Sequence, residues 1–376
     1  MGAERLRALA ASLTLVAFAA CGDAILVTGD QPSIMRVVVG VGDSAGNRFD
    51  AVATRAKLTD PAALAFEEET GILWVADRGS LIQSQGLTRR VGRVFTVTST
   101  GQLDRLVDAG GCSAGVCLES PYAMARAADG TIFITDIVGN RIFRIAANAR
   151  QLVVVAGTGA RTTSPDGTLA SSASLAAPAG IAIAADGRIL FAERDANTVR
   201  VILPDGTLGT IAGTGVPGFA GDGGAALTAR LAGPTGLARH ESLLYIADEL
   251  NNRVRVVDLD AGSIATVAGN GVPDFSGDEG PATTASLGQP SYVATSPDGR
   301  TLFVADQLNH RVRTIDRVSG IIRTFAGNGD MSWVPPGRPA GATPLLRPAA
   351  VIAVERGFLF VADGGHAVVW RTLVSL

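Results

Sequence analysis

Lysine is almost absent from this sequence of 376 residues, because Lys57 is the only one. Chemistry that needs a catalytic lysine is therefore excluded at every other position. Lysine and arginine number 32 against 35 acidic residues, so no basic excess exists to neutralise phosphates, and nucleic acid is not an expected partner. Aromatic residues make up only 5 % of the chain, which predicts a core of small and aliphatic side chains. With 46 glycines and 47 % hydrophobic residues, the composition predicts a globular β protein.

The first twenty residues have the pattern of an export signal. Two arginines precede an apolar run over residues 8–20, whose 13 residues are fewer than the about 20 that a membrane-spanning helix needs. The run ends in Phe18-Ala19-Ala20-Cys21-Gly22, which resembles a bacterial lipobox, although Phe18 stands where leucine is usual. The resemblance implies a signal peptide over residues 1–20, lipid on Cys21, and a linker over residues 21–33. The alternative is an ordinary cleaved signal in which Cys21 has no role.

The two other cysteines, Cys112 and Cys117, lie close together in a Gly-rich segment. An exported chain meets an oxidising compartment, so we expect a local disulfide between them. Zinc is the alternative, but it needs two more ligands at suitable spacing and none lies nearby. A bond across so small a loop acts mainly by stiffening it.

The chain repeats one unit six times. A proline opens each unit, at spacings of 60, 57, 56, 56 and 58 residues: Pro61, Pro121, Pro178, Pro234, Pro290 and Pro348. An apolar segment follows and ends in an acid in every unit: Asp77, Asp136, Glu193, Asp248, Asp306 and Asp363. An arginine-containing segment follows in most units, and then a segment that runs into glycine. Each unit therefore predicts four short strands separated by turns.

Six sheets of four antiparallel strands predict an all-β fold, a six-bladed β-propeller over residues 34–376. Asp-Gly pairs supply several of the expected hairpin turns. The sixth unit lacks a fourth strand, and residues 35–42 near the other end of the chain have the missing pattern. We therefore expect this leading strand to pair into the last blade, because closure removes an open sheet edge.

The segment Val304-Ala305-Asp306-Gln307-Leu308-Asn309-His310-Arg311-Val312-Arg313 is similar to the signature of the NHL repeat. The Gly-rich loop over residues 213–224 resembles bacterial members of the same family. The resemblance covers residues 34–376 and is strongest in the fourth and fifth units. It implies a six-bladed propeller, in agreement with the count of units. It does not fix a function, because such propellers include binding scaffolds and a few lyases and lactonases.

The six repeated acids are expected to be structural, since an active site would break the symmetry of the repeat. Each can accept backbone N–H groups and pair with the arginine of the following strand. Asp222 and Asp278 are interpreted as turn residues, because their loops lack the alternating carboxylates of a calcium site. No catalytic residue, metal or cofactor is therefore expected.

His310 and His366 are interpreted as occupying matching positions in neighbouring blades. The resemblance raises a metal as an alternative, because peptide-amidating lyases of this family hold zinc with histidines. The third histidine, His240, is expected on the opposite face, so we interpret all three as turn residues. A divalent metal at the central channel stays the less favoured alternative.

Binding is expected on one face of the ring. The connections between second and third strands, and those between blades, emerge on the same face, and every irregular segment falls there. The expected contact residues on that face are Trp333, Arg78, Arg89, Arg90, His310 and His366. Trp333 is either the anchor of a binding surface or folds back over a blade edge, and the sequence does not decide between the two.

The sequence therefore predicts a lipid-anchored propeller of the bacterial cell envelope, on the periplasmic or extracellular face, that works as a non-enzymatic binding scaffold. Its expected partners are an envelope protein or glycan, and the membrane itself through the lipid anchor. One alternative is a lyase or lactonase with a divalent metal at the central channel. Another is a structural envelope protein that positions its partners.

Overall fold

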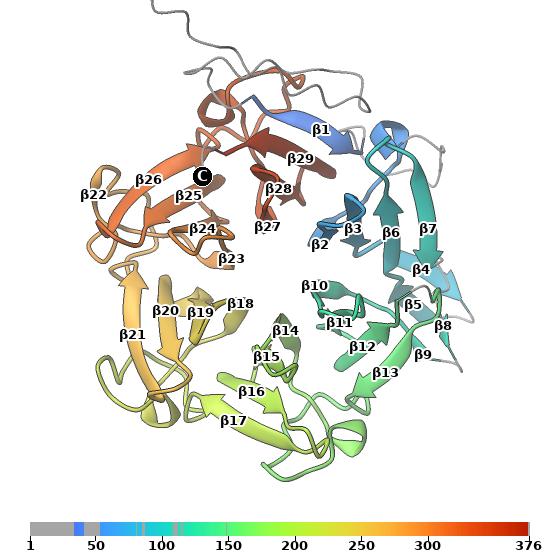
Figure 1. Ribbon diagram of the computed structural model, residues 1–376, viewed down its shortest axis with the longest axis vertical. Coiled ribbons are helices and arrows are strands. Elements are labelled where there is room, and N and C mark those ends of the chain that lie inside the picture. The colour runs from blue at the N-terminus through green and yellow to red at the C-terminus, as the bar shows by residue number, and fades with distance from the viewer. Residues whose placement is uncertain are drawn as a thin grey trace, which may run out of the picture. The chain divides into compact units, whose positions relative to one another are not determined.

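The computed structural model describes residues 34–40, 53–79, 81–84, 87–107, 112–113, 116–147 and 149–374. Six antiparallel sheets of four or five strands are arranged around a central axis, as Figure 1 shows, and the predicted six-bladed β-propeller is confirmed. The expected signal peptide, Cys21 and the linker lie outside the described residues. Within the described residues, no helix has the length and apolar character needed to cross a membrane.

The blades follow one another along the chain. Blade 1 consists of β2 (Pro61–Glu67), β3 (Ile72–Asp77), β6 (Arg93–Val97) and β7 (Leu103–Val107). Blade 2 consists of β10 (Pro121–Arg126), β11 (Ile132–Asp136), β12 (Arg141–Ile145) and β13 (Val153–Ala156). Blade 3 consists of β14 (Pro178–Ile183), β15 (Ile189–Glu193), β16 (Thr198–Ile202) and β17 (Leu208–Ala212). Blade 4 consists of β18 (Pro234–His240), β19 (Leu243–Asp248), β20 (Arg253–Asp258) and β21 (Ser263–Ala268).

Blade 5 consists of β23 (Pro290–Thr295), β24 (Thr301–Asp306), β25 (Arg311–Asp316) and β26 (Ile321–Ala326). It also has a short fifth strand that the sequence did not predict, β22 (Gly280–Pro281), which pairs with β26. Blade 6 consists of β27 (Pro348–Val354), β28 (Phe358–Asp363), β29 (Val368–Leu373) and β1 (Arg36–Val39).

The inner strands begin at the six repeated prolines, as predicted, and each contacts the inner strand of the next blade around the ring. Their small residues have a steric reason. A Cβ at Gly180 would lie 2.0 Å from the Thr235 carbonyl oxygen, and one at Gly236 would lie 2.4 Å from the Cα of Tyr292. Glycine therefore lets the inner strands of blades 3, 4 and 5 approach backbone to backbone.

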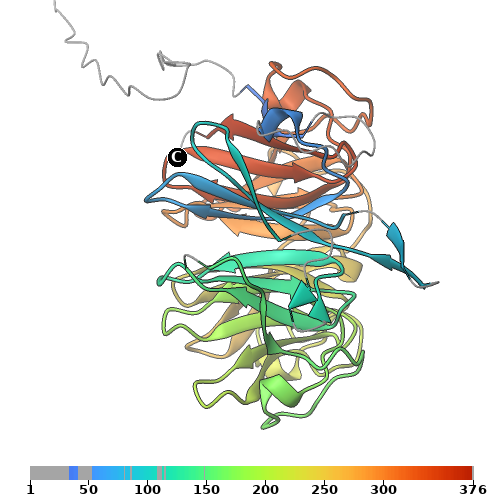
Figure 2. The same ribbon diagram turned by 90° about the vertical axis from the view of Figure 1, so that its right-hand side faces the viewer.

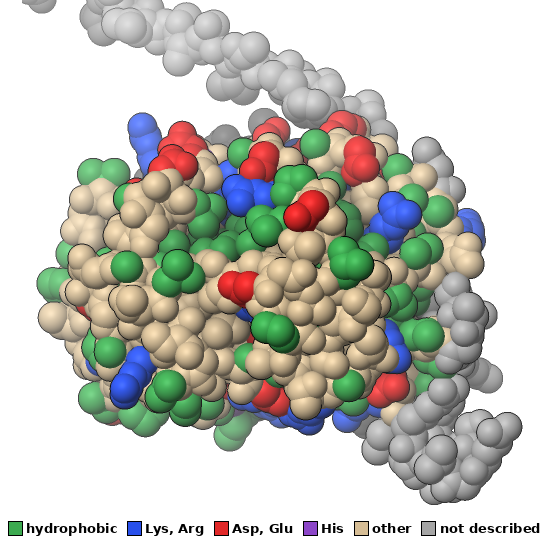
Figure 3. Space-filling model, turned by 90° about the horizontal axis from the view of Figure 1, so that it is seen from below, with side chains coloured by type: hydrophobic (Ala, Val, Ile, Leu, Met, Phe, Trp, Pro, Cys, Tyr) green, Lys and Arg blue, Asp and Glu red, His purple; other side chains and the backbone are tan. Residues whose placement is uncertain are grey.

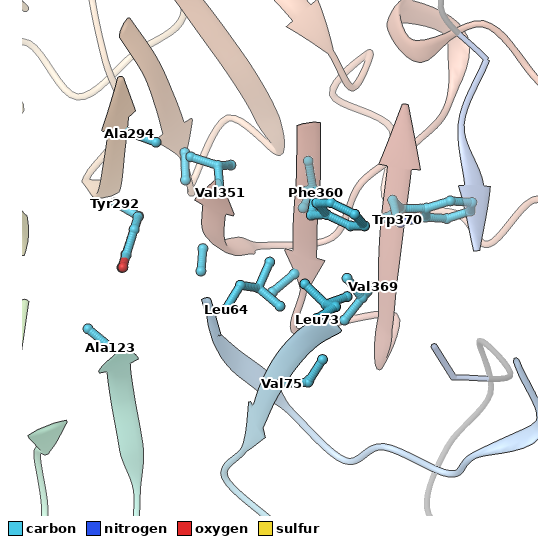
Figure 4. Close-up of a cluster of buried hydrophobic side chains, with 14 of the residues drawn as sticks. Leu64, Leu73, Val75, Ala123, Tyr292, Ala294, Val351, Phe360, Val369 and Trp370 are labelled. Atoms are coloured by element: carbon cyan, nitrogen blue, oxygen red, sulfur yellow. The ribbon is translucent and has the colours of Figure 1, made fainter. Parts of the chain in front are cut away.

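The leading strand closes the ring. Val37 of β1 lies opposite Trp370 of β29, and Val39 lies opposite Val369. Trp370 is fully buried beside β1, as Figure 4 shows. The strand is shorter than predicted, because it covers residues 36–39 instead of 35–42, and the residues after Gly40 lie outside the described part. The predicted closure by the first strand is nevertheless confirmed.

Two faces of the ring differ in their connections. One face carries the connections between second and third strands and those between blades, and we call it the loop face. We call the opposite face the turn face. Two small hairpins interrupt blade 1 and its link to blade 2: β4 (Leu81–Ser84) with β5 (Leu87–Arg90), and β8 (Cys112–Ser113) with β9 (Val116–Cys117). The β4–β5 hairpin projects on the right in Figure 2, which is the side of the loop face. On the edge of the ring seen in Figure 3, hydrophobic, acidic and basic side chains are interspersed.

Candidate functional site

The acid at the end of each second strand binds the loop that enters its own blade. Asp248 and Asp306 are fully buried and accept the backbone N–H groups of Ala232 and Gly288, each at 2.7 Å. Burial raises the pKa of both carboxyl groups to about 6, although backbone N–H groups, asparagine and arginine all oppose the shift. The desolvation offsets much of the ion-pair attraction, so these acids serve to fix the loops in place. The predicted structural role is consistent with this geometry.

The arginine that pairs with the acid is the second one of the third strand. Arg255 lies 3.6 Å from Asp248, and Arg313 lies 3.3 Å from Asp306. The sequence predicts that an arginine of this strand pairs with the acid without distinguishing the two, and in blades 4 and 5 it is the second. Arg253 donates to the carbonyl oxygens of Asn251 and Asn270, because its position at the start of β20 directs it to the loops.

The loop before each blade completes this arrangement. Asp222 accepts a hydrogen bond of 2.6 Å from Arg255, and Asp278 accepts one of 2.6 Å from Arg313. Phe219 stacks on Arg253 with its ring centroid 3.8 Å from the guanidinium, and Phe275 stacks on Arg311 at the same distance. The two aspartates therefore bind arginine, which agrees with their predicted structural use and leaves their carboxylates occupied.

Blades 1 and 3 follow the same plan with local changes. Arg200 pairs with Glu193 at 2.7 Å and with Asp166 at 2.8 Å. Arg93 pairs with Asp77 inside the protein, although the β4–β5 hairpin separates the two in sequence. In blade 2 Asp136 has no such arginine, and it accepts backbone N–H groups from Glu119, Ser120 and Gly139.

Blade 6 replaces the ionic arrangement by an aromatic one. Asp363 accepts hydrogen bonds from the Trp370 indole N–H at 3.1 Å and from His366 Nδ1 at 2.8 Å. Trp370 stands where blades 4 and 5 have the buried arginine. Trp333 stacks on Trp370 with centroids 5.6 Å apart and meets His366 edge-on at 5.5 Å. Trp333 thus folds back over blade 6, yet it stays 38 % exposed at the loop face.

His310 and His366 do not occupy matching positions, so this interpretation was wrong. Counted from the acid of each blade, His366 corresponds to Asn309, which donates to Asp306 at 2.9 Å. His310 corresponds to Ala367, and both have a left-handed backbone, with φ of 54° and 57°. The sequence-based interpretation missed this offset of one residue.

The two histidines differ in electrostatics as well. Burial alone would lower the pKa of His366, but the hydrogen bond and the negative charge of Asp363 outweigh it and raise the pKa. His366 Nε2 also lies 3.1 Å from the Met331 carbonyl oxygen, so both ring nitrogens face acceptors. Burial lowers the pKa of His310, whose Nδ1 accepts the backbone N–H of Arg347 at 3.2 Å.

The mouth of the channel at the loop face is charged and asymmetric. The residue that directly follows the blade acid varies around the ring. It is arginine in blades 1 and 3 and a different residue in each of the other four: Arg78, Ile137, Arg194, Glu249, Gln307 and Gly364. Arg194 pairs with Glu249 of the next blade at 3.1 Å, and Arg78 pairs with Asp60 at 3.1 Å. Beneath them Tyr122 of blade 2 reaches the Ser291 carbonyl oxygen of blade 5 at 3.5 Å.

Tyr122 therefore spans the channel near the loop face, and Arg78 lies over its ring, 5.3 Å from the centroid. Burial raises the pKa of Tyr122, so its hydroxyl stays protonated and neutral. The sequence-based interpretation missed Tyr122, Arg194 and Glu249. A comparison of the residue that follows the acid in the six units would have found Arg194 and Glu249, because this position varies while the acid before it is repeated.

The predicted contact residues form two separate groups. Arg78 and Arg90 share Asp60, with Arg90 at 3.9 Å, whereas Trp333 and His366 lie in contact on blade 6. Arg89 lies in β5, and its side chain is outside the described part.

Exposed apolar side chains mark the same face. Three blades carry one at the connection between the second and third strands: Val138 is 52 % exposed, Leu250 51 % and Leu308 48 %. Together with Trp333 they provide contacts of the kind that protein interfaces use.

The cysteine and metal predictions stay predictions. Cys112 and Cys117 lie directly opposite each other in the β8–β9 hairpin, which suits a disulfide. In the part of the chain that the structure describes, no three His, Cys, Asp or Glu residues are grouped to hold a metal ion.

Comparisons with known proteins agree with the fold. A family model described as the Teneurin NHL domain matches residues 32–218. NHL repeat-containing protein 2 of Gallus gallus is 30 % identical over 162 residues, which cover 40 % of this chain and 22 % of that protein. Virginiamycin B lyase of Nocardia farcinica is 28 % identical over 256 residues, which cover 62 % of this chain and 73 % of that protein.

Two solved structures show the same architecture at low sequence identity. An auxiliary nutrient binding protein from Bacteroides thetaiotaomicron has a TM-score of 0.64 at 12 % identity, over 90 % of this chain and 76 % of that one. A gluconolactonase from Xanthomonas campestris has a TM-score of 0.57 at 16 % identity, over 92 % and 96 %. These likenesses bear on the fold alone.

Six blades of four or five strands, each fixed by a buried acid, define a β-propeller of the repeat type. The chain is a six-bladed β-propeller, and it is similar to NHL-repeat proteins in its repeat signature and, over residues 32–218, in its match to the Teneurin NHL domain. It spans about a fifth of the length of NHL repeat-containing protein 2.

Proposed function

We propose that this protein is an exported propeller, anchored to a membrane of the bacterial envelope by lipid on Cys21, that binds an envelope protein or glycan without catalysis. The observation that carries the proposal is that two sets of residues on the loop face have different roles. The repeated acids and the arginines that pair with them are used to fix loops, whereas large apolar side chains of the same face stay accessible. Among the latter are Leu250, Leu308 and Trp333, which are 51 %, 48 % and 38 % exposed.

A surface of this composition suits macromolecular contact. Interfaces combine a few large apolar or aromatic anchors with a polar rim. Here the apolar tips stand around a mouth whose charges are paired, such as Arg194 with Glu249. Paired charges at a rim add specificity more than affinity.

Capture of partners from the producing cell envelope tests the proposal. The anchored protein is cross-linked in intact cells, and its partners are compared among Trp333→Ala, the double variant Leu250→Ser with Leu308→Ser, and the parent. The matched control is Val318→Ser, because Val318 is 86 % exposed but lies in a turn on the turn face. A partner that survives both loop-face changes would contradict binding through this face.

The anchor has its own test. Cys21→Ser is expected to release the protein from the membrane fraction into the soluble one. Continued residence in the membrane would refute lipidation while leaving the binding proposal standing.

A second function, a lyase or lactonase with a divalent metal, is favoured by one observation, the similarity to virginiamycin B lyase over 62 % of this chain. The donor atoms fit a metal poorly. His310 Nδ1 already accepts a backbone N–H, and Asp363 Oδ2 already accepts from both Trp370 and His366. Metal analysis of the purified protein separates the two functions, because one tightly held ion per chain would favour the enzyme.

A further inference from the structure

The channel is hollow at its other end, on the turn face. A cavity of about 260 Å³ lies among the ends of the inner strands of blades 2 to 6, and a neighbouring one of about 240 Å³ lies between β2, β10 and β27. The two share Met124, Arg126, Ile352 and Ala353. Most of the residues that line them are aliphatic, although polar atoms form the larger part of the accessible walls. Tyr122 spans the channel on the opposite side, near the loop face. This hollow is large enough for a small organic molecule.

Three polar groups at the hollow have no partner among the residues that the structure describes. The Nε of Arg126 and the Oε2 of Glu68 are both buried without a hydrogen bond. Tyr292 is 4 % exposed and lines the larger cavity, and no residue in the described ranges hydrogen-bonds its hydroxyl. Figure 4 shows this hydroxyl directed toward the side of Ala123 on β10. Burial raises the pKa of Tyr292 to about 12, so the hydroxyl is a donor at neutral pH.

Buried polar groups are nearly always satisfied by a partner, because an unmade hydrogen bond is costly. Two donors and one acceptor at the walls of the hollow lack a partner in the described part of the chain, and a bound molecule reaches the Arg126 and Glu68 atoms, which have almost no accessible surface, once those side chains turn toward it. The charge of the site favours an anion, since the guanidinium groups of Arg126 and Arg239 both line the cavity. Arg239 is held by the carbonyl oxygens of Ile183 at 2.7 Å and Glu241 at 2.6 Å, which fixes its orientation.

The ion pair that Arg126 makes with the protein is weak. Arg126 pairs with Glu69 at 3.2 Å, and the Glu69 side chain is 68 % exposed. An exposed pair of this kind contributes little and can open without large cost. The Nε proton of Arg126 takes no part in that pair, which is made through another guanidinium nitrogen.

We propose that the turn-face end of the channel binds a small aliphatic hydroxycarboxylate. The carboxylate accepts from Arg126, the ligand's hydroxyl group donates to Glu68, and a ligand oxygen accepts from Tyr292. The aliphatic body contacts Met124 and Ile352. The site lies on the face opposite the proposed partner surface, so either assignment can fail without the other.

Binding of 2-hydroxy-4-methylpentanoate to the full chain, measured by titration calorimetry, tests the assignment. Arg126→Gln is expected to weaken binding about tenfold or more, because a charge-assisted hydrogen bond is lost. Tyr292→Phe is expected to weaken it several-fold. The matched control is Arg188→Gln, since Arg188 lies in a first turn of the turn face, outside the cavity, and should leave the affinity unchanged.

Two related probes sharpen the result. The uncharged 4-methylpentane-1,2-diol should bind far more weakly than the acid, and 4-methylpentanoate, which lacks the hydroxyl, should fall between them. Circular dichroism of each variant identifies any that misfolds, and Arg126→Lys then replaces Arg126→Gln, with partial binding expected. Absence of binding by the parent at millimolar concentration, or affinity equal in the parent and the folded Arg126 variant, overturns the assignment.

Discussion

His366 donates to the carboxylate of Asp363 at 2.8 Å, in the position where blades 4 and 5 use an asparagine. Its other nitrogen lies 3.1 Å from the Met331 carbonyl oxygen, which can only accept. Both contacts are therefore satisfied at once by the protonated imidazole. The loop that carries Met331 and Trp333 is thereby linked to the protonation state of one histidine.

We expect the free energy of unfolding to fall as the pH rises through the folded-state pKa of His366. The pKa is raised in the folded state, so the folded protein binds this proton more tightly than the unfolded chain, whose histidine pKa is about 6.5. The contribution is therefore complete below about pH 6.5 and is lost as pH rises through the folded pKa. The groups that act on His366 are Asp363, Asp330 and, with opposite sign, His310.

Urea unfolding between pH 5 and 9 measures this effect. His366→Asn keeps a donor for Asp363, as blades 4 and 5 do, and should remove the decline above pH 6.5. His240→Asn is the control on the turn face and should keep it. A decline of equal size in the His366 variant would assign the effect to other groups.

The buried arginine of blade 5 should be costly to remove alone. Arg313→Met leaves Asp306 and Asp278 without their cation, and breaking a buried pair costs about 3–5 kcal/mol. Arg300→Met is the control, because the Arg300 side chain is 80 % exposed and its change should stay within about 0.5 kcal/mol. Chemical denaturation of both variants measures the difference, and a small effect in both would show that the acid does not depend on its arginine.

Fold and site were predictable to different degrees, for physical reasons. The six prolines and acids mark strand boundaries because the backbone geometry at the inner strand and at the loop entry is the same in every blade. The aromatic arrangement of blade 6 was hidden, since Trp333 is distant in sequence from His366 and Trp370, and these two replace residues of different chemistry. Tyr122 was missed because nothing local shows that a side chain of blade 2 reaches blade 5 across the channel.

The turn-face hollow was equally invisible in the sequence. Arg126, Glu68 and Tyr292 come from three blades, and only the closed ring brings them to one channel. These three residues point to a site because their polar groups lack hydrogen-bond partners in the part of the folded protein that the structure describes, and a sequence does not show which groups lack them.

The β8–β9 hairpin should carry a disulfide. Cys112 and Cys117 face each other across the two strands, and side chains at directly opposite positions lie close together. Thiol titration of the denatured, unreduced chain should find no reactive group from this pair, and two after reduction. The bond should add little to global stability because it closes a very short loop. Two reactive thiols before reduction would refute it.

Removal of β1 should open the ring. The strand covers the edge of β29, and Met35, just before it, and Val39, its last residue, are fully buried. A chain starting at Val41 would leave the β29 edge without its partner strand and uncover apolar surface around Trp370, so we expect a lower melting temperature and association through the open edge. A chain starting at Ser33 keeps β1 and serves as the matched control. Melting and size-exclusion chromatography compare the two. Equal melting temperatures and monomeric elution of both would mean that the other blades hold the ring together without a closing strand.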